Sequence, residues 1–272
     1  MRRAPATAKL NLALVVGPRR GDGRHELATV LQRLDAADRI ALAPAERLRV
    51  TGFAADTLVT AALRALAEEA GVEPRWAAHI EKRLPVAAGL GGGSSDAATA
   101  LRLANETLER PLGEARLQRL AASLGADVPF FLVPGPQFGT GDGTALSPLA
   151  LPQDYWVVLL LPHGARKSST RAVYESFDAR GGESGYAERV ARLTGALAAV
   201  RRPRDLAALP SNDLASSPLA SRLLSLGAFR ADVTGAGPCV YGLFLRHGVA
   251  EDARQAVSVL GRSWLTAPAW YF

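Results

Sequence analysis

The chain has 272 residues, 48 % of them hydrophobic, and a formal net charge of +6 at pH 7, so it is long enough for one large core or two modest ones. A single cysteine, Cys239, excludes an internal disulfide, and the apolar run at 12–16 is too short for a signal sequence or a membrane span, so we expect a cytoplasmic protein. Its basic residues are scattered rather than clustered with aromatics, which suits an anionic small substrate as well as a nucleic acid.

The first half of the chain alternates between short apolar runs and helical repeats. Asp56 is suited to begin the first of the helices and Gly71 to end it. Hydrophobic periodicity predicts strands at 10–16, 40–42, 48–51 and 76–80, and helices at 57–69, 95–108 and 114–124.

The stretch before the second helix, PVAAGLGGGSSDAATA (85–100), has four glycines and two serines between positions 89 and 95. Glycines let backbone N–H groups approach an anion without an intervening Cβ, and a following helix adds its unpaired first-turn donors. The stretch lacks the Gly-Lys-Ser/Thr of a Walker loop, and Ser94 stands where a dinucleotide fingerprint needs glycine. It therefore suits a phosphate, while a plain turn whose serine caps the helix stays open as the alternative.

Residues 137–154, rich in Gly and Pro, are expected to separate two halves of the chain, with turns at Gly139, Gly141 and Gly143. Residues 180–185 are expected to form an exposed loop. The second half predicts a strand at 155–161, helices near 186–199 and 217–226, a hairpin-like pair at 229–234 and 239–245, a helix at 250–260 and a short terminal strand. These elements indicate an α+β protein with two domains, 1–150 and 151–272.

Seven blocks spread over nearly the whole chain resemble the GHMP kinases. The glycine stretch is similar to the phosphate loop of that family, and its extra glycines resemble the branch that acts on 4-diphosphocytidyl-2-C-methyl-D-erythritol. The other blocks follow in the family's order: APATAKLNL (4–12), GDGRHEL (21–27), LGADVPFFL (124–132), STRAVYESFD (169–178), NDL (212–214) and TGAGPCVYGLF (234–244).

This resemblance implies a two-domain GHMP kinase fold, with a ribosomal protein S5 domain 2-like N-terminal domain, a ferredoxin-like C-terminal domain and an active site between them. It implies transfer of the γ-phosphoryl group of ATP to the 2-hydroxyl of 4-diphosphocytidyl-2-C-methyl-D-erythritol, a step of the non-mevalonate route to isoprenoid precursors. Three alternatives stay open: another GHMP kinase of the homoserine or mevalonate type, a non-catalytic nucleotide-binding module, and a nucleic-acid binder suggested only by the basic charge.

Phosphoryl transfer needs alignment, neutralised oxygen charge and a group that accepts the proton of the hydroxyl. On spacing alone, Asp127 is an ordinary Asp-x-Pro turn residue and Lys9 an exposed lysine near the N-terminus. The resemblance implies instead that Asp127 is the catalytic base and that Lys9 keeps its carboxylate ionised.

For ATP, the resemblance implies that the glycine stretch holds the phosphates and that residues beside it hold the adenine. Thr57 stands where the family commonly has asparagine, so adenine recognition is expected to rely more on the backbone or on Asp96. The residues assigned to ATP are Leu58, Lys82, Pro85, Val86, Ala87, Ala88, Gly89, Leu90, Gly91, Gly92, Gly93, Ser94, Ser95 and Asp96.

For the alcohol substrate, the resemblance implies hydrogen bonds from His25 to the cytosine, stacking of Tyr174 on the same base, and Asn11 near the erythritol. Arg24 stands where a tyrosine is usual. Its guanidinium plane is able to stack on the pyrimidine or to meet the diphosphate.

A second glycine cluster lies between the hairpin-like strands. The resemblance assigns Gly235 and Gly237 to the substrate phosphates, although a plain hairpin loop would have the same sequence. No spacing of His, Cys, Asp or Glu predicts a metal held by the protein. Mg²⁺ is expected to arrive with ATP, with a contact to Ser94 or Ser95.

Overall fold

Two sheets organise the computed structural model, which describes residues 1–165 and 169–269. The first contains β1 Arg2–Arg19, β2 His25–Pro44, β3 Arg49–Thr51, β4 Trp76–Glu81, β5 Gln137–Gly141 and β6 Ala145–Pro148. The second contains β7 Trp156–Pro162, β8 Arg230–Val233, β9 Val240–Phe244 and β10 Gly261–Thr266. Their strand orders are β3-β4-β2-β5-β6, with β1 paired to β2, and β10-β7-β9-β8.

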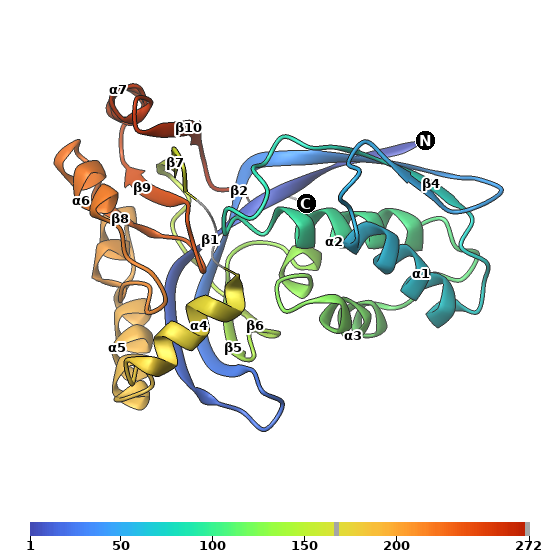
Figure 1. Ribbon diagram of the computed structural model, residues 1–272, viewed down its shortest axis with the longest axis horizontal. Coiled ribbons are helices and arrows are strands. Elements are labelled where there is room, and N and C mark those ends of the chain that lie inside the picture. The colour runs from blue at the N-terminus through green and yellow to red at the C-terminus, as the bar shows by residue number, and fades with distance from the viewer. Residues whose placement is uncertain (166–168, 270–272) are drawn as a thin grey trace.

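Helices accompany each sheet, and Figure 1 separates the two groups. One side of the molecule holds α1 Leu58–Ala70, α2 Gly92–Asn105, α3 Glu114–Leu124 and the 3-10 turn η1 Pro129–Leu132. The other side holds α5 Tyr186–Ala199, η2 Pro203–Ala208, α6 Pro218–Ser225 and α7 His247–Val257. Helix α4 Thr170–Ala179 packs through Phe177 against Leu14 and Val16 of β1. The long pair of β1 and β2 runs between the two groups (Figure 1).

The predicted mixed α+β class is confirmed, and most helices lie where periodicity predicts them. The helices α3 and α5 match the predicted ranges 114–124 and 186–199. Asp56 accepts the first-turn N–H groups of Val59 and Thr60, and Gly71 ends α1 with a positive φ of 67°. The turn at 180–185 is largely exposed, as expected. Helix α4 was not among the predicted elements.

Both long strands extend far beyond the predicted ranges 10–16 and 40–42. Antiparallel pairing runs along almost their full length, from Arg2 opposite Leu42 to Arg19 opposite His25. The pairing shifts register between Asn11 and Ala13, so Leu12 lies in a bulge. Because side chains alternate along a strand, Leu10 and Leu12 enter a core while the polar Lys9 and Asn11 face the other way.

Residues 137–154, expected to separate two halves of the chain, contain two strands that were not predicted. Residues 137–148 form β5 and β6, an antiparallel hairpin that pairs through β5 with β2. Gly141 and Gly143 adopt positive φ in the turn, as expected of glycine turns, but Gly139 lies inside β5. The composition of this segment could not predict these strands, because the pairing of β5 with β2 joins residues more than 100 positions apart.

The core is shared between the two sheets. Val157 and Leu159 of β7 pack toward β1 and β2 in one cluster, whereas Val158 and Leu160 pack toward α6 and α7 in another. All strands of the first sheet precede residue 150 and all strands of the second follow it. Since one cluster spans both sheets, the domain division at 150 stays a prediction.

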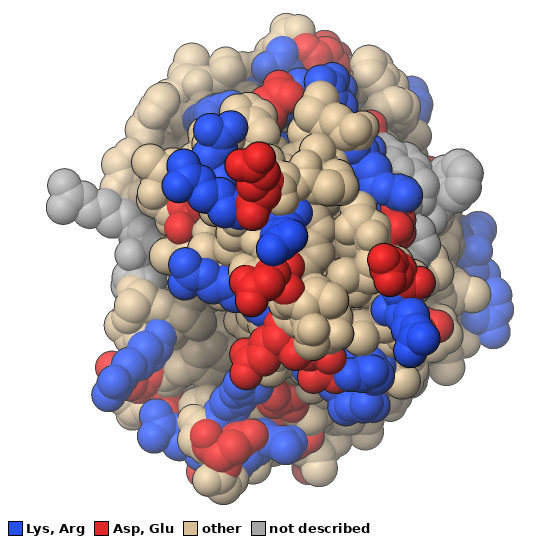
Figure 2. All heavy atoms as spheres, turned by 90° about the vertical axis from the view of Figure 1, so that its right-hand side faces the viewer, with Lys and Arg blue, Asp and Glu red and all other residues tan. Residues whose placement is uncertain are grey.

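Charged side chains of both signs mingle on the face shown in Figure 2, and no basic patch dominates it. This mixed surface gives no support on that face to the nucleic-acid alternative. Within the described ranges 1–165 and 169–269, none of the helices is both long and apolar enough to cross a bilayer.

Candidate active site

A cavity of about 640 Å³ lies where β1, the glycine stretch and α4 meet. Most of the predicted site residues line it: Lys9, Asn11, Arg24, His25, Leu58, Lys82, Pro85, Val86, Ala87, Ala88, Gly89, Leu90, Gly91, Gly92, Gly93, Ser94, Asp127, Tyr174 and Gly235. Ser95, Asp96 and Gly237 do not line it. Lining residues that were not predicted include Thr29, Phe53, Asp142, Thr170 and Arg171.

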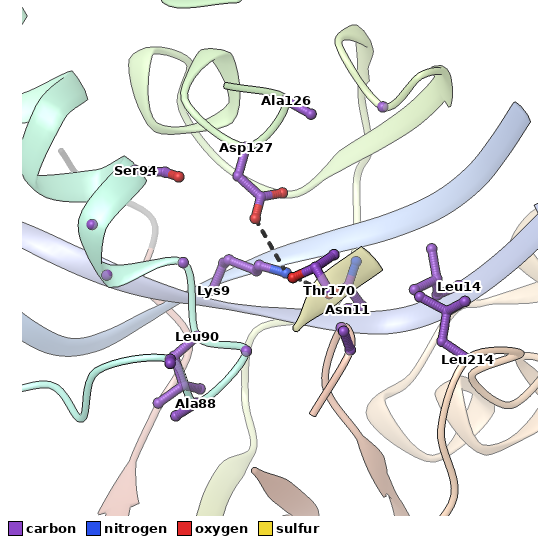
Figure 3. A pocket seen from close by; sticks show the side chains of 18 of the residues that line it. Lys9, Asn11, Leu14, Ala88, Leu90, Ser94, Ala126, Asp127, Thr170 and Leu214 are labelled. Carbon is purple, nitrogen blue, oxygen red and sulfur yellow. Dashed lines mark hydrogen bonds and ion pairs between the residues drawn. The ribbon is translucent and has the colours of Figure 1, made fainter. Parts of the chain in front are cut away.

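Lys9 and Asp127 point toward one another across this cavity (Figure 3). The Lys9 Nζ and Asp127 Oδ2 atoms are 3.7 Å apart, with side chains 5 % and 43 % exposed. The amine also donates to Asn11 Oδ1 at 2.5 Å. An oxygen about 2.8 Å from both Lys9 Nζ and Asp127 Oδ2 is geometrically allowed, because those atoms are less than two hydrogen-bond lengths apart. The pair is therefore suited to receive a hydroxyl group.

The glycine stretch passes close to β1 and to the loop after β8. Gly89 and Gly91 have φ of +86° and +70°. A Cβ on Gly89 would lie 2.3 Å from the Thr234 carbonyl oxygen, and one on Gly91 would lie 2.9 Å from Lys9 Cγ. The backbone is further fixed because Lys9 N–H donates to the Leu90 carbonyl at 2.9 Å. Glycine is needed at both positions for backbone conformation and for space.

Helix α2 begins inside the glycine stretch, at Gly92 rather than at the predicted Ser95. Its N-cap is Gly91, which offers no side-chain hydrogen bond to the first turn, and no acidic residue occupies that turn. Gly91, Gly92, Gly93 and Ser94 all line the cavity. A helix N-terminus that opens on a cavity without a side-chain cap is able to hold an anion by its N–H groups and dipole.

Lys82 forms a buried cluster with two aspartates behind this helix start. Its Nζ donates to Asp38 Oδ2 at 2.6 Å and to Asp96 Oδ2 at 2.7 Å. Asp38 Oδ1 also accepts the N–H groups of Arg83 and Leu84, which fixes the chain entering the glycine stretch. Burial and the neighbouring Asp38 raise the pKa of Asp96 to about 7. Lys82 and Asp96, the two predicted adenine contacts, are therefore paired with each other, and Lys82 is also paired with Asp38.

His25 and Tyr174 meet at the opposite end of the cavity. Their rings stack with centroids 4.8 Å apart and planes 28° from parallel. His25 Nε2 lies 2.7 Å from Asp178 Oδ1, and Arg19 pairs with the other oxygen of Asp178 at 3.1 Å. Burial, together with the charge of Asp127, raises the pKa of Tyr174 to about 12, so its hydroxyl stays protonated. The two rings form a preformed aromatic wall.

Arg24 is already paired in this structure. Its Nη1 forms an ion pair with Asp142 Oδ2, which joins the tip of the β1–β2 hairpin to the β5–β6 turn. Thr144 donates its N–H and its hydroxyl to Asp142 Oδ1. The guanidinium lines the cavity from this fixed position. In the sequence, the glycine-rich turn around Asp142 indicates a turn but does not indicate that Asp142 pairs with Arg24.

Among the described residues, no group of three or more His, Cys, Asp and Glu side chains is arranged to hold a metal ion. The expectation that the protein holds no metal of its own stays a prediction. Ser94, at the start of α2, is the predicted magnesium contact that lines the cavity, whereas Ser95 is buried.

Family models, curated relatives and solved structures all place this chain among the GHMP kinases. The model of the GHMP kinases N terminal domain matches residues 57–135, and that of the GHMP kinases C terminal region matches residues 206–261. A 4-diphosphocytidyl-2-C-methyl-D-erythritol kinase of Salinispora tropica is 36 % identical, covering 94 % of this chain and 87 % of the relative.

Solved structures match over the whole length. A crystal structure of 4-(cytidine 5'-diphospho)-2C-methyl-D-erythritol kinase has a TM-score of 0.80 at 31 % identity, covering 98 % of this chain and 99 % of that chain. The mevalonate kinase of Methanococcus jannaschii has a TM-score of 0.76 at 11 % identity, covering 98 % of both chains. At this low identity, the likeness to the mevalonate kinase shows a shared fold and nothing more.

Proposed function

The chain belongs to the 4-diphosphocytidyl-2-C-methyl-D-erythritol kinases of the GHMP kinase family, and from this we propose that it phosphorylates the 2-hydroxyl of 4-diphosphocytidyl-2-C-methyl-D-erythritol with ATP. The reaction would belong to the non-mevalonate route to isoprenoid precursors. We also propose a cytoplasmic location, since the reaction consumes ATP.

One observation carries the proposal: the Lys9 amine and the Asp127 carboxylate meet in the same cavity that the glycine stretch lines. The hydroxyl oxygen would form its bond to the γ-phosphorus while its proton passes to Asp127. The bond from that phosphorus to the bridging oxygen breaks, and ADP leaves with the electron pair. Lys9 would place its charge beside the hydroxyl and beside the Asp127 carboxylate.

The start of α2 supports the binding half of the proposal. Its N–H groups and its partial positive charge would face the phosphates of ATP. Magnesium would enter bound to those phosphates and would supply positive charge to the transferring oxygens. Ser94 is the residue that we assign to contact it, because Ser94 lines the cavity beside Gly93.

At the other end, we assign His25, Tyr174 and Arg24 to the cytidine diphosphate part. His25 and Tyr174 already stack on one another, so a base would extend this stack or hydrogen-bond to its edge rather than enter between the rings. Asn11 and Gly235 lie next to Lys9 Nζ, where the alcohol would bind. The assignments of Ser95, Asp96 and Gly237 to ligands stay predictions.

The test is incubation of the protein with ATP, magnesium and diphosphocytidyl methylerythritol, followed by mass spectrometry. We expect a product heavier by one phosphoryl group together with one ADP. Homoserine and mevalonate, offered in parallel, are expected to give no product. Faster ADP release with either of them would favour another GHMP kinase, and ATP binding without turnover on any alcohol would favour a non-catalytic module.

A further inference from the structure

The buried side chains of Lys9, Asn11 and Thr29 form a row of hydrogen bonds in which each donor and acceptor is fixed. Lys9 Nζ is 2.5 Å from Asn11 Oδ1, Asn11 Nδ2 is 2.9 Å from Thr29 Oγ1, and Thr29 Oγ1 is 2.8 Å from the Ala13 carbonyl oxygen. Lys9, Asn11 and Thr29 are each at most 5 % exposed. Water therefore competes little for these three hydrogen bonds.

The direction follows from which atoms are able to donate. A lysine ammonium only donates, so it must face the oxygen of the Asn11 amide, and the NH₂ group must face Thr29. The carbonyl of Ala13 only accepts, so the single hydroxyl proton of Thr29 must go to it. Thr29 Oγ1 is then left as an acceptor for Asn11. An Asn11 amide turned by 180° would place its NH₂ group against the ammonium, which is repulsive.

The rotamer of Thr29 is also fixed from its other side. Its Cγ2 methyl lies against Gly139 of β5, where an added Cβ would approach to 3.0 Å. Gly139 leaves room for the methyl, and the methyl keeps the hydroxyl turned toward Asn11. This explains a glycine inside a strand, where glycine otherwise costs stability.

We propose that Thr29 is a positioning residue for the phosphoryl transfer: through the amide of Asn11 it holds the Lys9 amine in place beside Asp127. This inference rests on the proposed function. Thr29 lines the cavity but lies one residue farther than Asn11 from the reacting groups along the chain of hydrogen bonds. Its effect should therefore reach the reaction only through Asn11.

The test is a double-mutant cycle. Thr29→Val keeps the shape and the methyl but removes the hydroxyl, and it should lower kcat about 10-fold, since the buried Asn11 amide loses its partner. The KM for ATP should stay within about twofold, because none of these three side-chain hydrogen bonds involves the glycine stretch. Thr29→Ser, which restores the hydroxyl, should recover most of kcat. In an Asn11→Ala background, Thr29→Val should cause no further loss.

Thr29→Ala is measured alongside, so that the cycle does not depend on one variant folding well, and the thermal unfolding midpoint of each variant is recorded. Additive losses of kcat in the cycle, or no recovery by Thr29→Ser, would overturn the positioning role. A wild-type protein that fails to phosphorylate the diphosphocytidyl alcohol would overturn the proposed function instead. The two failures are thus distinguishable.

Discussion

At the scale of single residues, the proposed mechanism rests on two side chains from distant parts of the chain. Lys9 lies in β1 and Asp127 in the turn before η1, 118 positions later. Asp127 lies in the open cavity, whereas Lys9 is buried with Asn11. This difference in exposure suits the two roles that we propose, Asp127 accepting a proton and Lys9 supplying a fixed charge.

Replacing either residue by alanine should remove most turnover. We expect Lys9→Ala and Asp127→Ala each to lower kcat by about 10² to 10⁴-fold, the range typical of general acid–base groups. The Kd for ATP should change little, because the phosphate contacts that we propose are backbone N–H groups of the glycine stretch, which neither substitution removes. Calorimetric titration with ATP, combined with a coupled ADP-release assay, measures both quantities. Near-wild-type kcat in either variant would refute its assignment.

Asp96 gives a prediction about pH at the same scale. Its folded-state pKa of about 7 is higher than the usual 3.8, so the native state binds more protons than the unfolded state between those pH values. Stability from this group is present at low pH and declines as pH rises toward 7. At about 1.4 kcal/mol per pKa unit, a shift of about three units corresponds to a decline in the free energy of unfolding of roughly 4 kcal/mol, of which roughly 3 kcal/mol falls above pH 5.

Asp96→Asn removes this titration, and comparison of the two proteins isolates it from other carboxylates. Urea unfolding at pH 5 and pH 8 is the measurement. Relative to Asp96→Asn, the wild type should lose stability between these pH values. A constant difference between the two proteins at both pH values would contradict the raised pKa.

At the scale of elements, the glycine stretch acts as one unit between β1, α2 and the loop after β8. Ala88 carbonyl accepts the N–H of Cys239, and Thr234 Oγ1 accepts the N–H of Asn11 and donates to the Gly89 carbonyl. The stretch is thus attached to both sheets. Its conformation depends on these contacts as well as on its own glycines.

Gly89→Ala should disrupt that unit, since alanine at a φ of +86° is strained and its Cβ would overlap the Thr234 carbonyl. We expect the KM for ATP to rise about 10-fold or more, which corresponds to a binding loss of about 1.4 kcal/mol. Gly195→Ala in α5 is the matched control, because an added Cβ there meets no atom within 4 Å. Equal KM values for the two variants would refute the role of Gly89.

Elements defined by local pattern could be predicted from the sequence. Helix α3 follows from its 3.6-residue periodicity, and the glycine stretch from its composition. The full length of β2 could not, because buried polar residues such as Gln32, Arg33 and Asp38 interrupt its apolar pattern. Asp38 escaped notice for the same reason. Its partner Lys82 lies 44 positions away, so only the pairing of β2 with β4 brings them together.

At the scale of the whole molecule, Arg230 joins the two sheets. Its side chain, 6 % exposed, donates to the carbonyl of Leu12 in the bulge of β1 at 2.6 Å. It also donates to the carbonyls of Leu206, Leu209 and Pro210 around η2. A guanidinium suits this site because its five N–H donors spread in a plane. The carbonyl of Leu12, at the bulge of β1, thereby forms a contact between the two sheets.

Arg230→Met should test this connection. The substitution keeps much of the apolar stem, but it removes the Arg230 donors from four carbonyls. Leu12 keeps the Tyr241 hydroxyl and Leu206 keeps the Leu209 N–H as donors. Asp232, 3.7 Å away, also loses this cation. We expect the free energy of unfolding to fall by about 3 to 5 kcal/mol, as when one partner of a buried ion pair is removed. Arg192→Met, at an exposed position of α5, should change it by less than about 0.5 kcal/mol. Urea unfolding followed by circular dichroism measures both variants, and similar midpoints would show that Arg230 does not stabilise the contact between the sheets.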